Sequence, residues 1–507
     1  MAENDTETET PAEGIWDDDH LERWKDADFL LLFLKNRIAE KRAADETQSY
    51  VLNLDAKWGG GKTFFLTRLQ CQLKSEGHLV AYVNAWEDDH ATDPLVPIIV
   101  EIDKVLKAHI DKNENLKINW AEAKKYGLRI AGSIAKQGIN AAILNTTGIN
   151  ADVLVKNLPK DIKKITNNGP ELFDHFGAEL LETFSKQKTA IKKFKSNLKI
   201  LLDEIEKLEK EEDKKACVPL FILIDELDRC RPTYAIELLE RVKHLFDVDN
   251  VVFILATNTD QLQHSIKAVY GGDFDAKRYL YRFFNRTYLF GKPNTNQFVE
   301  HLYKQHLSDI DILSSPFEDF TDEELKLKFL QCTFSSFPLE PRDIEQCFEL
   351  LRNIITIWRK KARIELIIMV PLIILFQQKR AFDDLDFSHS IKELLSSSIW
   401  ANNYNLPSPR KSFVSIHSVK SGKNINLLNL FLNAWKRSNE TYSQSRAEFY
   451  ESTDFASIEE QWTIKILNDE FQRENYHHNY SGLSIIAQYP RLISSAGQLV
   501  DLSKDDD

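Results

Sequence analysis

Residues 49–69, SYVLNLDAKWGGGKTFFLTRL, decide how this sequence is interpreted. The segment SYVLNL (49–54) alternates and then turns apolar like a buried strand, and KTFFLTRLQCQLKSEG (62–77) repeats apolar residues every four positions, as one face of a helix does. Three consecutive glycines at 59–61 lie between them. In this context a glycine-rich turn predicts a phosphate-binding loop, because its backbone N–H groups can curl around phosphate oxygens and the helix amino terminus adds partial positive charge.

One position departs from the phosphate-loop pattern G-x-x-x-x-G-K-[ST]. Gly61, Lys62 and Thr63 match it, but Ala56 stands where the first glycine is expected. A small side chain is tolerated there if the local dihedral angles stay in an allowed region. The alternative is an ordinary glycine turn that binds no ligand. This alternative is disfavoured only if the rest of the chain supplies the other parts of a nucleotide site.

Length and composition set the limits of the fold. With 507 residues the chain predicts two or three domains, and 43% hydrophobic with 28% charged residues is typical of a globular protein. The net charge is −13, but residues 1–19 carry eight acidic groups and no basic one, which leaves −13 + 8 = −5 for the remainder. We expect a disordered acidic tail over residues 1–20, and the remaining charge neither requires nor excludes a nucleic-acid partner.

Cysteine usage and the apolar runs predict a cytoplasmic protein. The five cysteines are scattered and form no C-x-x-C pair, which favours reduced thiols over disulfides or a zinc site. No basic-then-apolar signal peptide opens the chain. The longest apolar run, LIIMVPLIILF (366–376), is shorter than the roughly 20 residues that a membrane span needs, so we expect a buried helix and no transmembrane segment.

An acidic pair follows a second apolar run. In VPLFILIDELDRCRP (218–232), the apolar residues 220–224 lead directly into Asp225 and Glu226. Such a run predicts a parallel strand covered on both faces, and ligands of α/β folds bind at the carboxyl ends of such strands. One carboxylate would hold Mg²⁺ and the next would polarise the attacking water. The alternative is that the pair only begins a solvated loop.

Two further strands are predicted. HLVAYVNAW (78–86) follows the first helix, and NVVFILATN (250–258) ends in Thr257 and Asn258. These two polar residues could reach a γ-phosphate or the attacking water. They could equally cap the next helix, and the two roles do not exclude each other.

Three motifs together resemble the KAP family of P-loop NTPases. They are W-G-x-G-K-[ST] at Trp58–Thr63, N-A-W at Asn84–Trp86 and I-D-x-L-D-R-C at Ile224–Cys230. The tract YLYRFFNRTYLF (279–290) is similar to the segment leading into the family's fifth strand, and LEPRDIEQ (339–346) resembles the start of its helical lid.

The resemblance covers about residues 20–360, with three departures. They are Ala56 for glycine, Glu226 where aspartate is usual and Arg282 where lysine is common. Only the first puts activity in doubt.

The resemblance implies an ATP site with Mg²⁺. Lys62 would reach the β- and γ-phosphate oxygens, Thr63 and Asp225 would hold Mg²⁺, and Glu226 would orient the water. Asn258 and Arg342 would sense the γ-phosphate. Arg282 or Arg286 would act on the nucleotide of a neighbouring subunit, or else form salt bridges within their own core. The full set expected to contact the nucleotide is Lys57, Trp58, Gly59, Gly60, Gly61, Lys62, Thr63 and Phe64.

Many relatives carry transmembrane helices between the two halves of the nucleotide-binding core. Here that interval begins with GLRIAGSIAKQGINAAILNTTGI, which Arg129, Lys136 and Asn140 interrupt, so we expect a helical insertion that does not span a membrane. Residues 156–199 hold ten lysines against five acidic groups. They form either a solvated helix face or a contact with nucleic acid.

These observations predict an α/β fold: a P-loop NTPase core with a parallel sheet, a helical insertion and a carboxyl-terminal helical lid. The expected parts are an acidic tail (1–20), the first half of the core (21–125), the insertion (126–215), the second half of the core (216–292), the lid (293–405) and a mainly helical region (406–507).

Three functions are compatible with this organisation. The resemblance implies a bacterial ATPase that acts with partner defence proteins against phage, as a nucleotide-driven switch or assembly, and such folds often work as homo-oligomers. A nucleic-acid-engaged motor or clamp is the second. An ATP-binding scaffold with little turnover, which Ala56 would permit, is the third.

Overall fold

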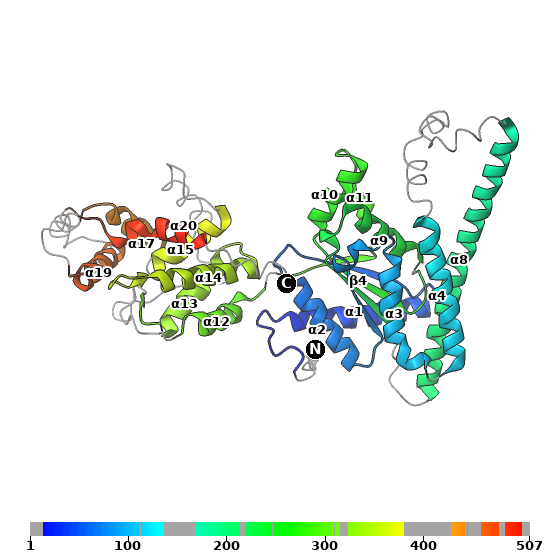
Figure 1. Cartoon of the computed structure of the whole chain (residues 1–507). Coiled ribbons are helices and arrows are strands. Elements are labelled where there is room, and N and C mark those ends of the chain that lie inside the picture. The colour runs from blue at the N-terminus through cyan, green and yellow to red at the C-terminus, as the bar shows by residue number, and fades with distance from the viewer. Residues whose placement is uncertain are drawn as a thin grey trace. The chain divides into compact units, whose positions relative to one another are not determined.

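The computed structural model describes residues 14–111, 113–135, 169–211, 218–245, 247–291, 293–308, 310–314, 323–379, 427–441, 444, 458–475 and 482–498. The chain divides into a first unit, Met1–Lys292, and a second unit, Pro293–Asp507 (Figure 1).

A five-stranded parallel sheet forms the centre of the first unit, in the order β2-β3-β4-β1-β5. All neighbouring strands in it are parallel, as predicted for an α/β core. The register aligns Asn84 with Asp225 and Asp55 with Thr257, so the polar strand ends lie along one edge of the sheet. The strands are β1 (Tyr50–Asp55), β2 (Val80–Asn84), β3 (Leu220–Asp225), β4 (Val251–Thr257) and β5 (Arg286–Leu289).

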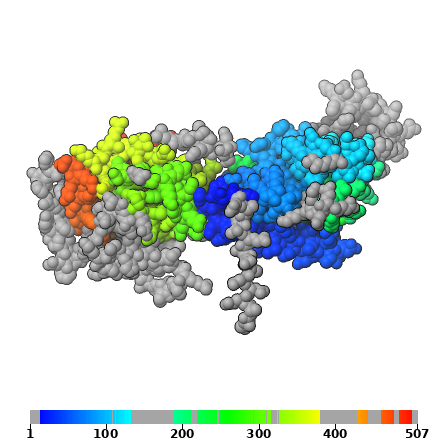
Figure 2. Space-filling view, turned by 90° about the horizontal axis from the view of Figure 1, so that it is seen from below, coloured from blue at the N-terminus to red at the C-terminus, as the bar shows by residue number. Residues whose placement is uncertain are grey.

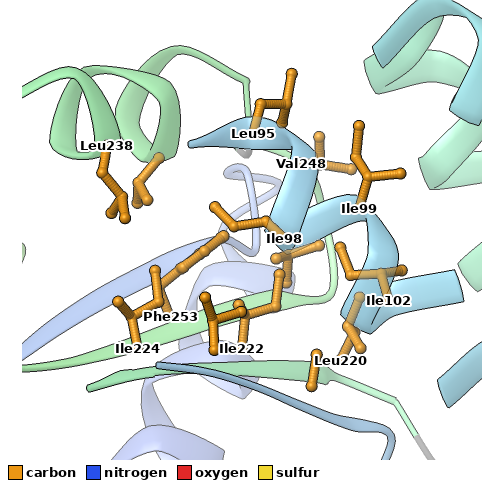
Figure 3. Packing of buried hydrophobic residues seen from close by; sticks show 14 of the residues in the cluster. Leu95, Ile98, Ile99, Ile102, Leu220, Ile222, Ile224, Leu238, Val248 and Phe253 are labelled. Atoms are coloured by element: carbon orange, nitrogen blue, oxygen red, sulfur yellow. The ribbon is translucent and has the colours of Figure 1, made fainter. Parts of the chain in front are cut away.

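Helices cover both faces of the sheet. On one face, α1 (Arg23–Ala43) and α2 (Lys62–Ser75) pack over alternate residues of β1 and β4. On the other, α3 (Leu95–Ile110), α9 (Pro232–Leu245) and α10 (Thr259–Tyr270) bury the opposite side chains of β3 and β4. Figure 3 shows the isoleucines and leucine of α3 meeting those of β3 in this second layer. Burial on both faces explains why β3 and β4 are continuously apolar.

The structure describes the chain from residue 14 onward, nearer the amino terminus than the acidic composition suggests. Residues 14–20, which we assigned to a disordered tail, are placed by the structure. Trp16 is buried, its ring meets Phe65 at 6.0 Å between centroids, and its Nε1 donates to Gln72 Oε1 at 2.9 Å. One large aromatic side chain therefore anchors a segment that its acidic neighbours would leave in solvent. Residues 1–13 lie outside the described part.

In its described part, the insertion contains two long helices that run side by side (Figure 1). They are α4 (Glu114–Ala135) and α8 (Gly169–Glu211), and α4 continues through the domain boundary that we expected at residue 125. Their surfaces adjoin in the space-filling view, cyan for α4 and green for α8 (Figure 2). Phe194 and Trp120 are buried between these helices and α3. Residues 136–168, with most of the small apolar segment, lie outside the described part.

Short elements complete the first unit: η1 (Glu87–His90) and η2 (Leu227–Arg229) follow β2 and β3 at the polar edge, and α11 (Ala276–Leu280) precedes β5 in the chain. The described part of the second unit is mainly helical and contains a two-stranded parallel pair, β6 (Leu313–Ser314) and β7 (Ile364–Glu365). The apolar run at 366–376 forms a buried helix, α15, as predicted. In the described part of the chain, no helix combines the length and the apolar character that crossing a membrane requires.

The elements of the second unit are α12 (Thr295–His306), β6 (Leu313–Ser314), α13 (Glu323–Ser336), α14 (Pro341–Ile357), β7 (Ile364–Glu365), α15 (Leu366–Lys379), α17 (Leu427–Ser438), α19 (Ile458–Arg473), η4 (Ile485–Gln488) and α20 (Tyr489–Gly497).

Candidate active site

The glycine-rich loop joins β1 to α2 at the polar edge of the sheet. Gly59 and Gly61 have φ values of 78° and 83°, in the left-handed region that favours glycine, and Gly61 is the N-cap residue of α2. Ala56 is not among the non-glycine residues with positive φ in the described ranges, and its N–H donates to Thr257 O at 3.1 Å. The loop therefore accommodates a side chain at the position where the pattern has its first glycine.

The loop offers donors that the protein itself does not use. Within the described residues, the N–H groups of Gly59, Gly61, Lys62 and Thr63 have no hydrogen-bond partner, as expected for the start of a helix. Lys62 is buried, and its Nζ donates to Ala56 O at 2.9 Å. Burial lowers the pKa of this ammonium group, while the nearby carboxylates of Asp228, Asp225 and Asp55 act in the opposite direction. Unpaired amides around a buried cation fit the phosphates of a nucleotide.

Asp225 ends β3 and is fully buried. Its Oδ1 accepts from the Glu226 N–H at 2.8 Å, and its Oδ2 accepts from the Tyr82 hydroxyl at 3.0 Å. Burial and this carboxylate together raise the pKa of Tyr82, so the phenol stays a donor. The structure thus fixes the orientation of the carboxylate that we predicted as a Mg²⁺ ligand.

The chain alone offers few metal ligands at this edge. Thr63, the other predicted ligand, is exposed at the start of α2. Across the described ranges, no three or more His, Cys, Asp or Glu side chains cluster as a metal site. The donor set therefore fits a Mg²⁺ ion that takes its remaining ligands from water and phosphate, as is usual for this ion.

Glu226 begins the short helix η2 in an unusual conformation. Its φ of 58° is in the left-handed region, which non-glycine residues seldom adopt. Its Oε1 forms an ion pair with Arg229 Nη1 at 3.0 Å, and the guanidinium of Arg229 lies 5.5 Å from the ring centroid of Trp86. Burial raises the pKa of Glu226, and Arg229 opposes that shift. The acidic pair is therefore not the start of a solvated loop.

Asp228 is a site residue to which the sequence analysis gave no role. This buried carboxylate accepts from Trp58 Nε1 at 2.6 Å and from the Asn258 N–H at 3.0 Å. It thereby connects the phosphate loop to the end of β4. The only signal in the sequence is its place in the motif I-D-x-L-D-R-C, three residues after Asp225.

Asn258 caps α10, which confirms one of its two predicted roles. Its side-chain oxygen accepts from the Gln261 N–H at 3.4 Å. The Thr257 hydroxyl donates to Asn53 Oδ1 at 2.7 Å, inside the sheet. Asn258 is buried at the same edge as Asp225, so the second role, sensing the γ-phosphate, stays a prediction.

The remaining loop residues differ in exposure. Lys57 is exposed, and Trp58 is 52% exposed although its Nε1 is fixed by Asp228. Phe64 is half-buried, with its ring 6.4 Å from that of Trp16. Contacts of these three side chains with a nucleotide remain predictions.

Two of the predicted arginines, Arg282 and Arg286, do not join this group. β5 is the edge strand next to β1, and Leu289 at its carboxyl end pairs with Asp55, immediately before the loop. Arg286 pairs with Leu52 at the opposite end of β5, and Arg282 precedes the strand; both are exposed. Arg342 lies on α14 in the second unit, so its sensing role stays a prediction.

Comparison with known families identifies one match. Residues 36–287 match the KAP family P-loop domain. The match runs from α1 into β5 and so contains the glycine-rich loop, Asp225, Glu226 and Asn258. A search of curated proteins finds no significant match.

Proposed function

We propose, from the premise that residues 36–287 are a KAP family P-loop domain of a nucleotide-binding ATPase, that this chain hydrolyses ATP with Mg²⁺. The observation that carries the proposal is convergence: Lys62, Asp225, Glu226 and Asn258 come from separate segments and meet at one edge of the sheet. The energy would drive a switch or an assembly with partner proteins in bacterial defence against phage. That biological setting rests on the family resemblance.

Each side chain then has a separate task. The loop amides and Lys62 would bind the β- and γ-phosphates, and Thr63 and Asp225 would hold Mg²⁺, which neutralises charge as the phosphoryl group is transferred. Glu226 would orient the attacking water. Asn258, fixed by its cap and by Asp228, would contact the γ-phosphate or that water.

Substitution of Glu226 and Lys62 tests the enzymatic proposal. Glu226→Gln should leave ATP binding nearly intact and lower kcat by roughly 10²-fold or more. The reason is that this variant loses the carboxylate that orients the attacking water but keeps the phosphate-binding loop. Lys62→Ala should weaken ATP binding itself. Lys74→Ala, an exposed position on the same helix, is the matched control and should change neither. Equal turnover in wild type and Glu226→Gln would favour the ATP-binding scaffold instead.

We also propose that the active unit is a homo-oligomer. In the described part of the chain, the side chains of Arg282 and Arg286 form no hydrogen bond or ion pair, so salt bridging within the core gains no support. Their position, at or before the end of β5 opposite the loop, suits an arginine that reaches a neighbour's γ-phosphate. Such a residue can contribute on the order of 10³-fold in rate.

Mixing two inactive variants tests the shared site. Arg282→Ala or Arg286→Ala protein lacks one part and Glu226→Gln protein lacks the other, so mixed assemblies should contain some intact sites and recover activity. Sedimentation of the mixture must first show co-assembly. No recovery in co-assembled protein would contradict a site completed by the neighbouring subunit.

The basic face of the insertion supports nucleic-acid engagement as a second candidate. Lys193 Nζ lies 3.0 Å from the Tyr126 hydroxyl, and the cations of Lys125 and Arg129 lie 5.9 and 5.7 Å from the Tyr126 ring centroid. Lys192, next to Lys193, is exposed. Positive charge around an aromatic ring is a combination that single-stranded nucleic acids bind.

Salt dependence tests this second candidate. Affinity for an oligonucleotide should fall steeply with salt, and reversal of four of the insertion lysines to glutamate should abolish it. These lysines are Lys186, Lys188, Lys192, Lys193 and Lys195. Reversal of the exposed Lys35, Lys74, Lys104 and Lys117 is the control for net charge. Binding that ignores salt, or no binding at low salt, would leave the insertion as a solvated helix pair.

A further inference from the structure

Glu226 differs from its neighbouring acids in the kind of partner that it has. Asp225 accepts from a phenol and a backbone N–H, and Asp228 accepts from an indole and a backbone N–H. Glu226 instead pairs with a charged and partly exposed side chain, Arg229, whose exposed fraction is 29% against 10% for Glu226. A guanidinium on a flexible stem can leave, whereas the donors of the two aspartates are fixed by the fold.

Glu226 and Arg229, the two partners of the ion pair, lie in the same turn of the chain. The Arg229 N–H donates to Glu226 O at 3.1 Å, and the left-handed conformation of Glu226 starts this turn. Opening the pair therefore requires only side-chain rotation. No strand or long helix has to move.

Trp86 gives the guanidinium a second contact. This residue is 42% exposed and its indole lies under Arg229. The backbone N–H of Trp86 donates to Asn84 Oδ1 at 3.1 Å, at the end of β2. A cation over the face of an indole is attracted by the electrons of the ring. Arg229 is thus held by Glu226 and Trp86 together, beside the phosphate loop.

We propose that Arg229 is a positioning residue that keeps Glu226 from the attacking water until a nucleotide occupies the loop. The inference rests on the proposed ATPase function and adds its regulation. A carboxylate oxygen paired with a guanidinium at 3.0 Å is less able to accept a hydrogen bond from water. The phosphates of a bound nucleotide offer the guanidinium a competing anion, so binding opens the pair and frees Glu226 at the moment when it is needed.

Turnover measurements test this latch, by which we mean the Glu226–Arg229 ion pair that keeps Glu226 from the attacking water. Arg229→Gln should leave kcat at saturating ATP within about twofold of wild type, because a bound nucleotide has already opened the pair. It should lower the KM for ATP about 3- to 10-fold, because binding no longer has to break the pair. Arg229→Lys, which keeps the charge, should return the KM toward wild type. Arg278→Gln on α11, exposed and away from the edge, is the control. A fall in kcat for Arg229→Gln would overturn the latch, because Arg229 would then help catalysis.

A double-mutant cycle tests the pair without turnover. In the absence of nucleotide, Arg229→Gln should lower the melting temperature by about 1–3 °C, and it should have no such effect in a Glu226→Gln background. With Mg²⁺ and the non-hydrolysable analogue AMP-PNP bound, this coupling should vanish. Coupling that persists with AMP-PNP overturns the latch and leaves the ATPase proposal standing. No AMP-PNP stabilisation and no turnover in any variant would refute both.

Discussion

Two groups of buried carboxylates, one in each unit of the chain, have different surroundings. At the polar edge of the first unit, Asp225 and Asp228 accept hydrogen bonds from groups that are distant in sequence. In the second unit, burial raises the pKa of Glu365 to about 8 and that of Glu470 to about 7, and Glu365 Oε2 has no hydrogen-bond partner. Asp225 and Asp228 are therefore fixed as hydrogen-bond acceptors, whereas Glu365 stabilises its fold best when protonated. Glu470, which accepts from the Ser484 hydroxyl and the Ile485 N–H, is intermediate between the two cases.

The largest effect bearing on this comparison, a fall in kcat, is expected when Asp228 is substituted. Asp228→Asn keeps the volume but presents an amide N–H group to Trp58 or Asn258, both of which are donors. Loosening the loop and the end of β4 together should lower kcat by on the order of 10- to 100-fold. Steady-state kinetics at saturating ATP measures this, with circular dichroism to confirm folding. A folded variant within twofold of wild type would remove Asp228 from the site and weaken the contrast between the two regions.

The next largest effect, a dependence of the free energy of unfolding on pH, is expected from Glu365. The folded state binds its proton more tightly than the unfolded state, since burial raises the pKa from 4.5 to about 8. The contribution of the Glu365 proton to the free energy of unfolding is therefore full below pH 4.5 and is lost as pH rises through 8. Between pH 6 and 8 one such group lowers the free energy of unfolding by about 2 kcal/mol. Asp469 and Glu470 act in the direction of the shift and Arg363 against it.

Calorimetry on wild type and Glu365→Gln measures this dependence. The glutamine cannot ionise, so the variant should lose much of the fall in melting temperature between pH 6 and 8. Glu349→Gln on the helix α14 of the second unit is the control. Identical pH profiles for wild type and Glu365→Gln would show that Glu365 is charged in the fold, and the two regions would then not differ as described.

Local patterns predicted the strands, the loop and the meeting of their polar ends. Parallel strands buried on both faces must be apolar throughout, and their carboxyl ends share one edge, so Lys62, Asp225 and Asn258 could be grouped before their positions were known.

The side-chain network at that edge could not be predicted. Asp228 is 170 residues from Trp58 and 30 from Asn258, and its contacts depend on a strand order that local patterns do not specify. The packing of Trp16 was missed for another reason. Average composition over an acidic segment conceals one large apolar side chain that finds a partner in α2.

The smallest effect is expected at Ala56, and it concerns whether the edge is a working site at all. Ala56 has no positive φ, so Ala56→Gly relieves no strain; it should change kcat and the Kd for ATP by no more than about twofold and lower stability by roughly 0.5–1 kcal/mol through chain entropy. Gly61→Ala is the matched contrast, because φ there is 83° and an added Cβ is strained even in open space. It should weaken ATP binding clearly. A rise of tenfold or more in the turnover of Ala56→Gly would instead show that this one methyl group restrains hydrolysis, and the chain would be closer to a nucleotide-binding scaffold than to an efficient ATPase.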